Sequence, residues 1–567
     1  MNDRRATMAH ASVWTLALVA LATLFAVVAI RFAAQQSVWT DEATQLSGLS
    51  LGFADQLRWL AGRLPHIFAV PPDRMPPLSY WLGSIWTHAF GNSVLTARYL
   101  SVCLSVASVF ALWAVARQYL EGRAALICAA LLALSPNFVV EAAEIRAYAA
   151  FIFFSTLLIY SYLRLLAARL APSSLDLWAF ALAATLCSYT HFFGIVVSAG
   201  AFLCLFASYL QIGSRTEALG IVRKAKWPLL FYLISVVALI PFILSAVRIS
   251  GGGDVSTAAV ALPLSVRSHD LIKLVYRFFG HQSMLGIPGL SATALLAGLT
   301  LIAFSTTPGS NPRARQVALF LLVNLTLVAI IELTTRAFNA FSNTYNVWAL
   351  PVIALLAASS LSHRNRYVRI ASALSISVII AADCYAAVRL ATAGEIYAHT
   401  RSTVVKTAVD SAGPSNAIVL YVNDAAAIYF ALTYDYGGGL RQYIAGAGNA
   451  HLIGAPVGSP SLKLCDLAAG TLLVADDQEL PAEALQFLIA HPGEHTQALQ
   501  VLDKFLEDYH ADLAAHWTLV SRKEYLAQSA LALAILKRRT VNVSPSSANE
   551  DHGRCDSTIE AGGAHEK

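Results

Sequence analysis

The sequence predicts a polytopic α-helical membrane protein of about 11 transmembrane helices with a small C-terminal α/β extracytoplasmic domain. Two observations support this fold class. Of the 567 residues, 57% are hydrophobic and 13% are charged, and this charged share is about half that of an ordinary soluble domain. Apolar runs also recur from Ser12 to about Leu390, each long enough to cross a hydrocarbon core of about 30 Å as a helix.

The apolar runs define eleven predicted spans. They cover residues 12–33, 99–117, 124–140, 147–168, 175–190, 192–210, 227–247, 285–304, 317–334, 345–361 and 368–390. The first run follows a short basic segment, as in a signal peptide, but it is too long and no small-residue cleavage site follows. We therefore interpret it as a retained helix.

A further apolar segment, residues 76–90, is short and is interrupted by Gly83, Ser84 and His88. Basic residues decide how to interpret it, because short cytoplasmic loops collect Lys and Arg. With eleven spans and a cytoplasmic N-terminus, the cytoplasmic set is Arg4, Arg5, Arg117, Arg123, Arg164, Arg169, Arg215, Arg223, Lys224, Lys226, Arg313, Arg315, Arg364, Arg366 and Arg369. A twelfth span would move the later loops to the wrong side, so we predict a juxtamembrane or re-entrant helix.

This topology places four loops on the outer face, residues 34–98, 141–148, 248–284 and 335–346. The basic residues are scattered and form no basic-aromatic patch, which argues against nucleic acid as a partner. The bilayer is the expected surrounding of residues 1–390, which form the predicted transmembrane domain.

The C-terminal region is predicted to fold outside the membrane. In residues 391–540, "NAIVLYVNDAAAIYFAL" and "TLLVADD" are typical of strands followed by helices, and "EALQFLIAHPGEHTQALQVLDKFLEDYH" is typical of helix. From Val541 the composition turns polar, so residues 541–567 are predicted to be a disordered tail. The seven cysteines form no CxxC or Cys/His cluster, which argues against a zinc or redox site.

Charged residues gather at three predicted membrane edges. Asp41 and Glu42 follow the first span, and "EAAEIRAYAA" places Glu144 and Arg146 between the third and fourth spans. A charge so close to a membrane edge is costly without a partner, so these residues are candidates for function. Arg98, before the second span, is a candidate for a ligand contact or for anchoring a helix at the lipid head groups.

Other polar residues of these loops invite a plainer interpretation. We expect Asp55, Arg58 and Asp73 to lie in water as ordinary loop charges. His191, isolated in "CSYTHFFG" at a predicted helix turn, is interpreted as structural. Arg74 shares the two alternatives given for Arg98.

The order of several motifs resembles a known superfamily. "DEA" after the first span is followed by "PPLSYWL", "ARYLS", "LLALSPNFVVEAAEIRAYA" and "YNVWALP". This order resembles the GT-C superfamily of membrane glycosyltransferases over about residues 12–390. It is most similar to glycosyltransferase family 39 and its bacterial relatives, which include protein mannosyltransferases, the lipid A aminoarabinose transferase and lipopolysaccharide galacturonosyltransferases.

The resemblance implies a polyprenyl-phosphate sugar donor and an acceptor hydroxyl on a glycolipid, glycan or protein, at the outer face of the bacterial inner membrane. Asp41 matches the catalytic base of the family, and Glu42 lies beside it as in the family's acidic pair. Glu144, Arg146 and Tyr148 match the family through "EIRAY", and Arg98 matches through "ARY". In this pattern residues 1–390 are the catalytic domain.

Two departures from the family pattern concern donor binding. Met75 stands before the Pro-Pro pair, where relatives often carry His or Lys, and Arg74 one residue earlier is the candidate substitute. Relatives also commonly read Arg-Tyr before a later Pro, whereas this chain reads "NTYNVWALP". Tyr345 is therefore the candidate from that loop, with Asn343 and Arg336 as weaker ones.

The chemistry of sugar transfer requires few groups. A departing phosphate is stable as an anion and needs cations more than it needs a proton, which arginines at the membrane edge supply. The acceptor hydroxyl must lose a proton as it attacks the anomeric carbon, so a positioned carboxylate is required. This is the base half of inverting glycoside chemistry. The catalytic candidates are Asp41, Glu42 and Glu144, and the phosphate-binding candidates are Arg74, Arg98, Arg146, Tyr148 and Tyr345.

Three questions stay open at this point. No cofactor is required, although Asp41, Glu42 and Glu144 could hold a divalent cation. A transporter or flippase of lipid-linked sugars is the main alternative, but such proteins keep charges near the bilayer midplane, and the predicted spans carry almost none there. A membrane-anchored binding module is the third interpretation, although the C-terminal region contains no GxGxxG or P-loop.

Overall fold

The computed structural model describes most of the chain. The described residues are 2–64, 73–169, 171–212, 215–251, 278, 288–335, 340–342, 344–392, 402–422, 426–436, 440–445, 449–452, 462–463, 485–490, 498–508, 517–525 and 531–538. The chain forms two compact units. The first comprises Met1–Ala34, Ser47–Gly91 and Leu95–Gly394, and the second comprises Gln35–Leu46, Asn92–Val94 and Glu395–Lys567. Each unit is described by itself.

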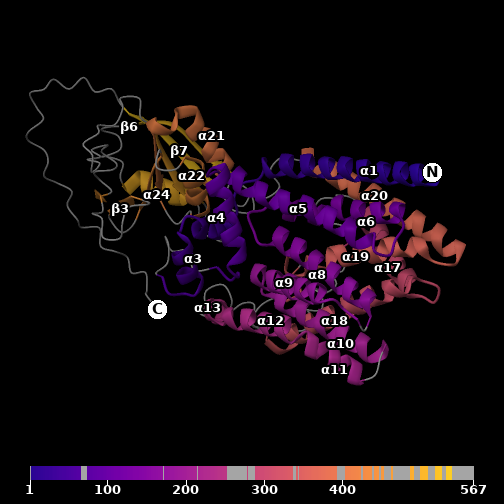
Figure 1. The fold of residues 1–567 in the computed structure, drawn as a ribbon. Coiled ribbons are helices and arrows are strands. Elements are labelled where there is room, and N and C mark those ends of the chain that lie inside the picture. Colours follow the sequence, from indigo (N-terminus) through magenta and orange to yellow (C-terminus); the bar gives the residue numbers. More distant parts are fainter. Residues whose placement is uncertain are drawn as a thin grey trace, which may run out of the picture. The chain divides into compact units, whose positions relative to one another are not determined.

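The first unit is helical (Figure 1). Its helices up to residue 169 are α1 (Asn2–Ala33), α2 (Thr40–Leu49, which begins in the second unit), α3 (Phe53–Leu60), α4 (Leu78–Phe90), α5 (Val94–Ala116), α6 (Gly122–Ala133), α7 (Pro136–Ala142) and α8 (Tyr148–Ala168). The later helices are α9 (Ser174–Thr190), α10 (Phe193–Ile212), α11 (Arg215–Lys224), α12 (Lys226–Ala238), α13 (Ile240–Gly251), α17 (Pro288–Thr306), α18 (Pro312–Thr335), η1 (Thr344–Asn346), α19 (Ala349–Ser359), η2 (Ser360–Ser362) and α20 (Arg366–Thr392).

The helices confirm a polytopic membrane protein. Within the described ranges, seven helices are long and apolar enough to cross a membrane, and the number rises to eight if the bent pair α6 and α7 is one span. Three other predicted runs, 175–190, 285–304 and 345–361, coincide with α9, α17 and α19, which do not meet this length and composition test. The predicted count of eleven therefore stays a prediction, as does the membrane placement of α4 in the 76–90 segment.

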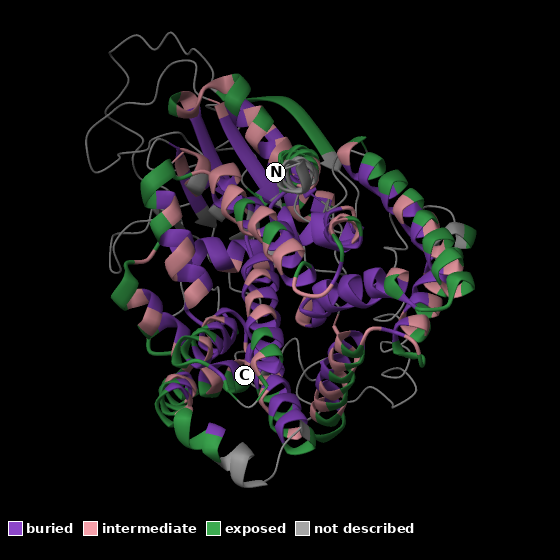
Figure 2. Ribbon diagram, turned by 45° about the vertical axis from the view of Figure 1, so that its right-hand side comes forward, coloured by how far each residue is buried: buried purple, intermediate pink, exposed green. Residues whose placement is uncertain are grey.

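Burial separates the central helices from the peripheral ones. In the most apolar stretch of Tyr148–Ala168, 78% of the residues are buried, whereas in that of Lys226–Ile249 only 17% are. Figure 2 shows the same contrast between buried and exposed helices. Helix α8 packs against α9 and α10. Large apolar side chains such as Ile234, Leu322 and Leu374 are exposed on the outer helices, as expected of surfaces that contact lipid.

The pair α6 and α7 is bent by 62°. The bend lies at Ser135 and Pro136, where Ser135 precedes α7 in a non-helical conformation and Pro136 opens it. Proline supplies no backbone N–H, so it is favoured at the first position of a helix and breaks the one before it. All of residues 141–150 are buried, so the "EIRAY" segment that follows α7 lies inside the first unit.

The second unit contains a mixed seven-stranded sheet, with strand order β4-β3-β2-β1-β5-β7-β6. Its elements are α21 (Ser402–Ala412), η3 (Pro414–Asn416), β1 (Ala417–Tyr421), α22 (Ala426–Tyr436), β2 (Arg441–Ala445), β3 (Asn449–Leu452), β4 (Leu462–Lys463), β5 (Leu485–Ala490), α24 (Ala498–Asp508), β6 (Trp517–Tyr525) and β7 (Leu531–Arg538). Strand β1 is parallel to both β2 and β5, and the remaining pairs are antiparallel. Apolar residues of one sheet face, among them Ile418 and Leu488, form a core with Leu502 and Phe505 of α24.

The structure corrects one local prediction in this unit. Residues 485–490 form strand β5, where the sequence predicted helix, and β5 lies between β1 and β7. An apolar strand buried in the middle of a sheet does not alternate polar and apolar residues, so its pattern does not distinguish it from a buried helix. "TLLVADD" and residues 541–567 lie outside the described residues, and the domain limits at residues 390 and 540 stay predictions.

Candidate active site

The two carboxylates at the start of α2 occupy a favourable helix position. Asp41 and Glu42 lie in the first turn of α2, where the positive end of the helix dipole stabilises negative charge. Glu42 is 1% exposed, and its Oε2 accepts a hydrogen bond from the Trp39 backbone N–H at 3.4 Å. This is one half of a capping box, in which the third helical residue reaches back to the N-cap amide. Asp41 is half-buried.

The segment before α2 is fixed by hydrogen bonds inside the second unit. The Val38 N–H donates to Ser402 Oγ at 3.0 Å, and the Ser37 and Thr403 hydroxyls lie 3.2 Å apart. Ser37 and Val38 are each 1% exposed. The backbone that leads to Asp41 is therefore held by the first turn of α21, which limits the motion of the carboxylate.

In the first unit, Asp73 is a buried acceptor. Its Oδ2 accepts hydrogen bonds from Tyr80 Oη at 2.6 Å and from Arg146 Nη1 at 2.8 Å, and its Oδ1 accepts from the Arg74 backbone N–H at 2.7 Å. The side chains of Arg146 and Asp73 are 4% and 7% exposed. The expectation that Asp73 lies in water was wrong, because its charge is paired inside the protein. Asp55 and Arg58 are exposed, as expected.

The "EIRAY" segment meets the start of α5. Ser101 Oγ donates to the Glu144 backbone carbonyl at 2.6 Å, and Arg98 lies one turn earlier on α5. Arg98 is 3% exposed and its Nη1 donates to the Ala33 carbonyl at 2.7 Å, at the end of α1. Glu144 is 8% exposed. Arg98 therefore links the ends of α1 and α5, close to the segment that carries Glu144.

An aromatic cluster surrounds His191, between α9 and α10. The ring centroids of Tyr345, Phe193 and Phe151 lie 5.3, 5.7 and 4.9 Å from that of His191. The ring of Tyr148 lies 5.9 Å away. Burial, and then the positive charge of Arg146, lowers the pKa of His191 to about 3, so the imidazole is neutral at pH 7.

The structure brings together some of the predicted residues. Arg146 lies over the ring of Tyr148, 5.8 Å from its centroid, and Tyr148 and Tyr345 both contact His191. The sequence interpretation missed Asp73 and His191 as members of this group. The Asp73 carboxylate shows no local signal of its burial, since Arg146 lies 73 residues away in the chain.

The other candidates are exposed, belong to the second unit or lie outside the described residues. The Arg74 side chain is exposed, and Arg336 and Asn343 lie outside the described residues. Asp41 and Glu42 belong to the second unit. Among the residues with defined positions, no three His, Cys, Asp or Glu side chains lie close enough together to hold a metal ion.

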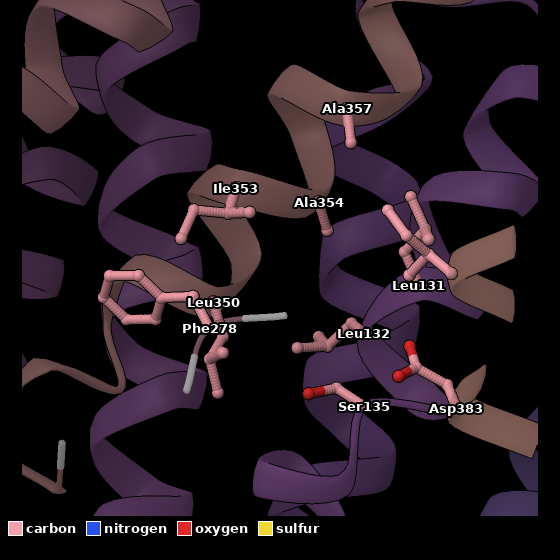
Figure 3. A pocket seen from close by; sticks show the side chains of 10 residues that line it. Leu131, Leu132, Ser135, Phe278, Leu350, Ile353, Ala354, Ala357 and Asp383 are labelled. Carbon is pink, nitrogen blue, oxygen red and sulfur yellow. The ribbon is translucent and has the colours of Figure 1, made fainter. Parts of the chain in front are cut away.

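A small cavity lies at the bend between α6 and α7. It has a volume of about 30 Å³ and is lined mainly by aliphatic side chains, with Ser135 and Asp383 as its polar residues. Figure 3 shows the Ser135 hydroxyl and the Asp383 carboxylate among the aliphatic side chains. Asp383 belongs to α20 and is 4% exposed. The cavity has room for about one water molecule, and none of the candidate site residues lines it.

The sequence and the fold both have known counterparts. Residues 74–245 match the family described as dolichyl-phosphate-mannose-protein mannosyltransferase, and no curated protein sequence matches the chain. The apo structure of ArnT from Cupriavidus metallidurans is similar with a TM-score of 0.50 and 14% identity, covering 93% of this chain and 98% of that one. ArnT bound to undecaprenyl phosphate gives a TM-score of 0.38 at 14% identity, over 92% and 98% of the two chains.

The S. cerevisiae protein O-mannosyltransferase Pmt1-Pmt2 complex, bound to its sugar donor, gives a TM-score of 0.32 at 17% identity. That match covers 41% of this chain and 34% of the yeast chain, so this protein matches about a third of the yeast length. The family match and the fold shared with apo ArnT confirm the resemblance to the GT-C superfamily of membrane glycosyltransferases.

Proposed function

We propose that this protein moves a sugar from a polyprenyl-phosphate donor to an acceptor hydroxyl on the outer face of a bacterial inner membrane. The observation that carries the proposal is the family match over residues 74–245, which includes Arg98, Glu144 and Arg146. Members of a family described by a dolichyl-phosphate-mannose donor transfer sugar from a lipid phosphate. The acceptor is a glycolipid, a glycan or a protein.

In the proposed reaction, Asp41 is the general base. It removes the proton of the acceptor hydroxyl, whose oxygen bonds to the anomeric carbon as the bond from that carbon to the phosphate oxygen breaks. The configuration at the anomeric carbon is inverted, and the electron pair of the broken bond leaves with the polyprenyl phosphate. Glu42 keeps the first turn of α2 in place through the Trp39 amide.

Arginines are proposed to stabilise the charge on the departing phosphate. Arg146 is buried and its guanidinium is oriented by Asp73 at 2.8 Å, so it presents a fixed cation. Preoriented cations stabilise a developing anion without the cost of reorganisation at the moment of reaction. Arg98, Arg74, Tyr148 and Tyr345 are further proposed phosphate contacts, and Glu144 is proposed to assist catalysis near Arg98.

The test of Asp41 is sugar transfer by the purified protein. Asp41→Asn keeps the size of the side chain but cannot accept the hydroxyl proton, so turnover is expected to fall by about 10² to 10⁴. Asp55→Asn, in the exposed pair with Arg58, is the matched control and is expected to leave turnover unchanged. Near-normal turnover of Asp41→Asn would remove it from the base role.

The proposed topology has its own test. Cysteines introduced at positions 365 and 450 of a cysteine-depleted protein are treated with an impermeant reagent in intact cells. Outward placement of the second unit predicts labelling at 450, whereas labelling at 365 instead would reverse the topology. Mass spectrometry of envelope glycolipids and glycoproteins, with and without the protein, would identify the sugar and the acceptor.

One observation favours the alternative of a transporter or flippase for lipid-linked sugars. Asp383 is a buried carboxyl within the α20 span, and ionisable groups inside a membrane often mark transport pathways. Asp383→Asn separates the two functions. Glycosyl transfer predicts unchanged turnover, because Asp383 lies among aliphatic residues at the α6–α7 bend, whereas a transport function predicts loss of lipid-linked sugar movement.

A further inference from the structure

Two buried histidines of the first unit form the same local turn. His191 Nδ1 accepts a hydrogen bond from the backbone N–H of Phe193 at 3.1 Å, and His363 Nδ1 accepts from the N–H of Asn365 at 3.0 Å. The two side chains bond to the amide two residues later. In a neutral imidazole, one nitrogen accepts and the other carries the proton, so both rings carry their proton on Nε2.

The two histidines differ at this second nitrogen. Nε2 of His363 lies 3.3 Å from Thr307 Oγ1 and 3.2 Å from the Pro308 carbonyl. Nε2 of His191 is buried, and it has no hydrogen-bond partner among the residues that the structure describes. Buried donors without a partner are rare in folded proteins because their desolvation is not compensated. Within the described part of the chain, His191 therefore holds an N–H group that lacks an acceptor.

The surroundings of His191 select the kind of acceptor that would fit. Phe151 stacks on the imidazole with an angle of 15° between the rings, and the Tyr345 and Phe193 rings make tilted and edge contacts with it. The cation of Arg146 lies over Tyr148, a ring that also contacts His191. An aromatic wall with one neutral N–H donor, beside an arginine whose charge is paired with Asp73 at 2.8 Å, favours a ligand that offers oxygen acceptors.

We propose that His191 Nε2–H donates a hydrogen bond to a phosphate oxygen of the lipid donor, next to Arg146. This inference rests on the proposed function and adds a phosphate contact to it. A second cation at this position would repel Arg146, whereas a neutral imidazole adds a charge-assisted hydrogen bond to the anion without that repulsion. The hydrogen bond between His191 Nδ1 and the Phe193 amide orients the Nε2–H group before the phosphate binds.

The experiment measures binding of undecaprenyl phosphate to the full-length protein in nanodiscs. His191→Asn keeps a short side-chain oxygen that can accept the Phe193 N–H but does not reach the Nε2 position. His191→Gln carries an amide N–H close to that position and loses the turn contact. His191→Phe keeps the stacking on Phe151 and has no donor. His363→Asn is the matched control, because the same turn there lies beside other partners.

We expect His191→Asn and His191→Phe to weaken binding by about 10- to 100-fold, as for loss of a hydrogen bond to a charged group. His191→Gln should lie between these variants and the wild type, and His363→Asn should bind as the wild type does. Undecaprenol, which lacks the phosphate, should bind equally to all of them. If His191→Asn does not fold, the comparison of His191→Phe with His191→Gln gives the same answer.

Three results would overturn the inference. If both His191→Asn and His191→Phe bind undecaprenyl phosphate with wild-type affinity, the His191 N–H points at an aromatic ring face instead. The proposal of a polyprenyl-phosphate sugar donor would still stand in that case. Equal losses for undecaprenol and undecaprenyl phosphate would mean that His191 only supports packing. Absence of undecaprenyl phosphate binding by the wild type would overturn the proposed donor class and this inference together.

Discussion

The Asp73→Asn substitution tests whether the buried pair with Arg146 holds the first unit together. The new amide would keep an oxygen for the Tyr80 hydroxyl but would lose the charge opposite Arg146. Both side chains are less than a tenth exposed, and Arg146 Nη1 lies 2.8 Å from Asp73 Oδ2. Removing one partner of a buried pair costs about 3 to 5 kcal/mol, because the other charge stays buried without compensation. Because an amide oxygen remains as an acceptor, we expect the lower end of that range.

The assay measures unfolding of the purified protein in detergent, and intrinsic fluorescence monitors the transition. Asp55→Asn removes the acid of an exposed pair with Arg58, in which the two side chains are 49% and 65% exposed, and such pairs contribute about 0 to 1 kcal/mol. The double variant Asp73→Asn, Arg146→Gln removes both charges, so it should be more stable than the sum of the single variants predicts. Equal stability of Asp73→Asn and Asp55→Asn would refute the reasoning.

Three further predictions concern donor use, packing and pH. Arg146→Gln should lower turnover more than Arg146→Lys, because Lys keeps the charge but loses the planar fork, and equal turnover of the two variants would contradict a phosphate role. Gly48→Ala should destabilise the protein by about 1 to 3 kcal/mol, because the added Cβ would meet the rings of Tyr80 and Trp59, whereas Gly52→Ala meets nothing within 4 Å and serves as the control in the same unfolding assay. The pKa of His191 is about 3, below its ordinary value of 6.5, so below pH 6.5 only the unfolded chain takes up this proton. The contribution of His191 to stability should therefore be unchanged above pH 6.5 and less favourable by about 3 kcal/mol at pH 4.5. The difference in stability between the wild type and His191→Asn, followed over this pH range, measures that contribution.

The helices could be predicted from the sequence because their signal is local. A run of about 20 apolar residues has few alternatives to a membrane helix, and the long spans of the first unit coincide with predicted runs. The bend at Pro136 also follows from the chain, since proline ends the preceding helix. The short helices α9 and α19 show that apolar character was easier to predict than length.

The site was harder to predict because its contacts are not local. Asp73 is surrounded by prolines and arginine in the sequence, which is typical of a loop in water, and its burial depends on Tyr80 and Arg146. His191 is a single residue without a motif, although its place between two apolar runs is one where a side chain can accept from the first backbone amides of the next helix. Strand β5 required knowledge of β1 and β7, between which it lies.

The attachment of the α2 segment to α21 has a consequence for the order of events during synthesis. Val38 and its partner Ser402 are separated by 364 residues. At a translation rate of about 5 to 20 residues per second, the ribosome needs about 20 to 70 s to make the intervening chain. The peptide before Asp41 therefore leaves the ribosome long before its hydrogen-bond partner exists. A nascent chain that ends before Ser402 cannot fix this segment, so the protein would complete this attachment only late in its own synthesis.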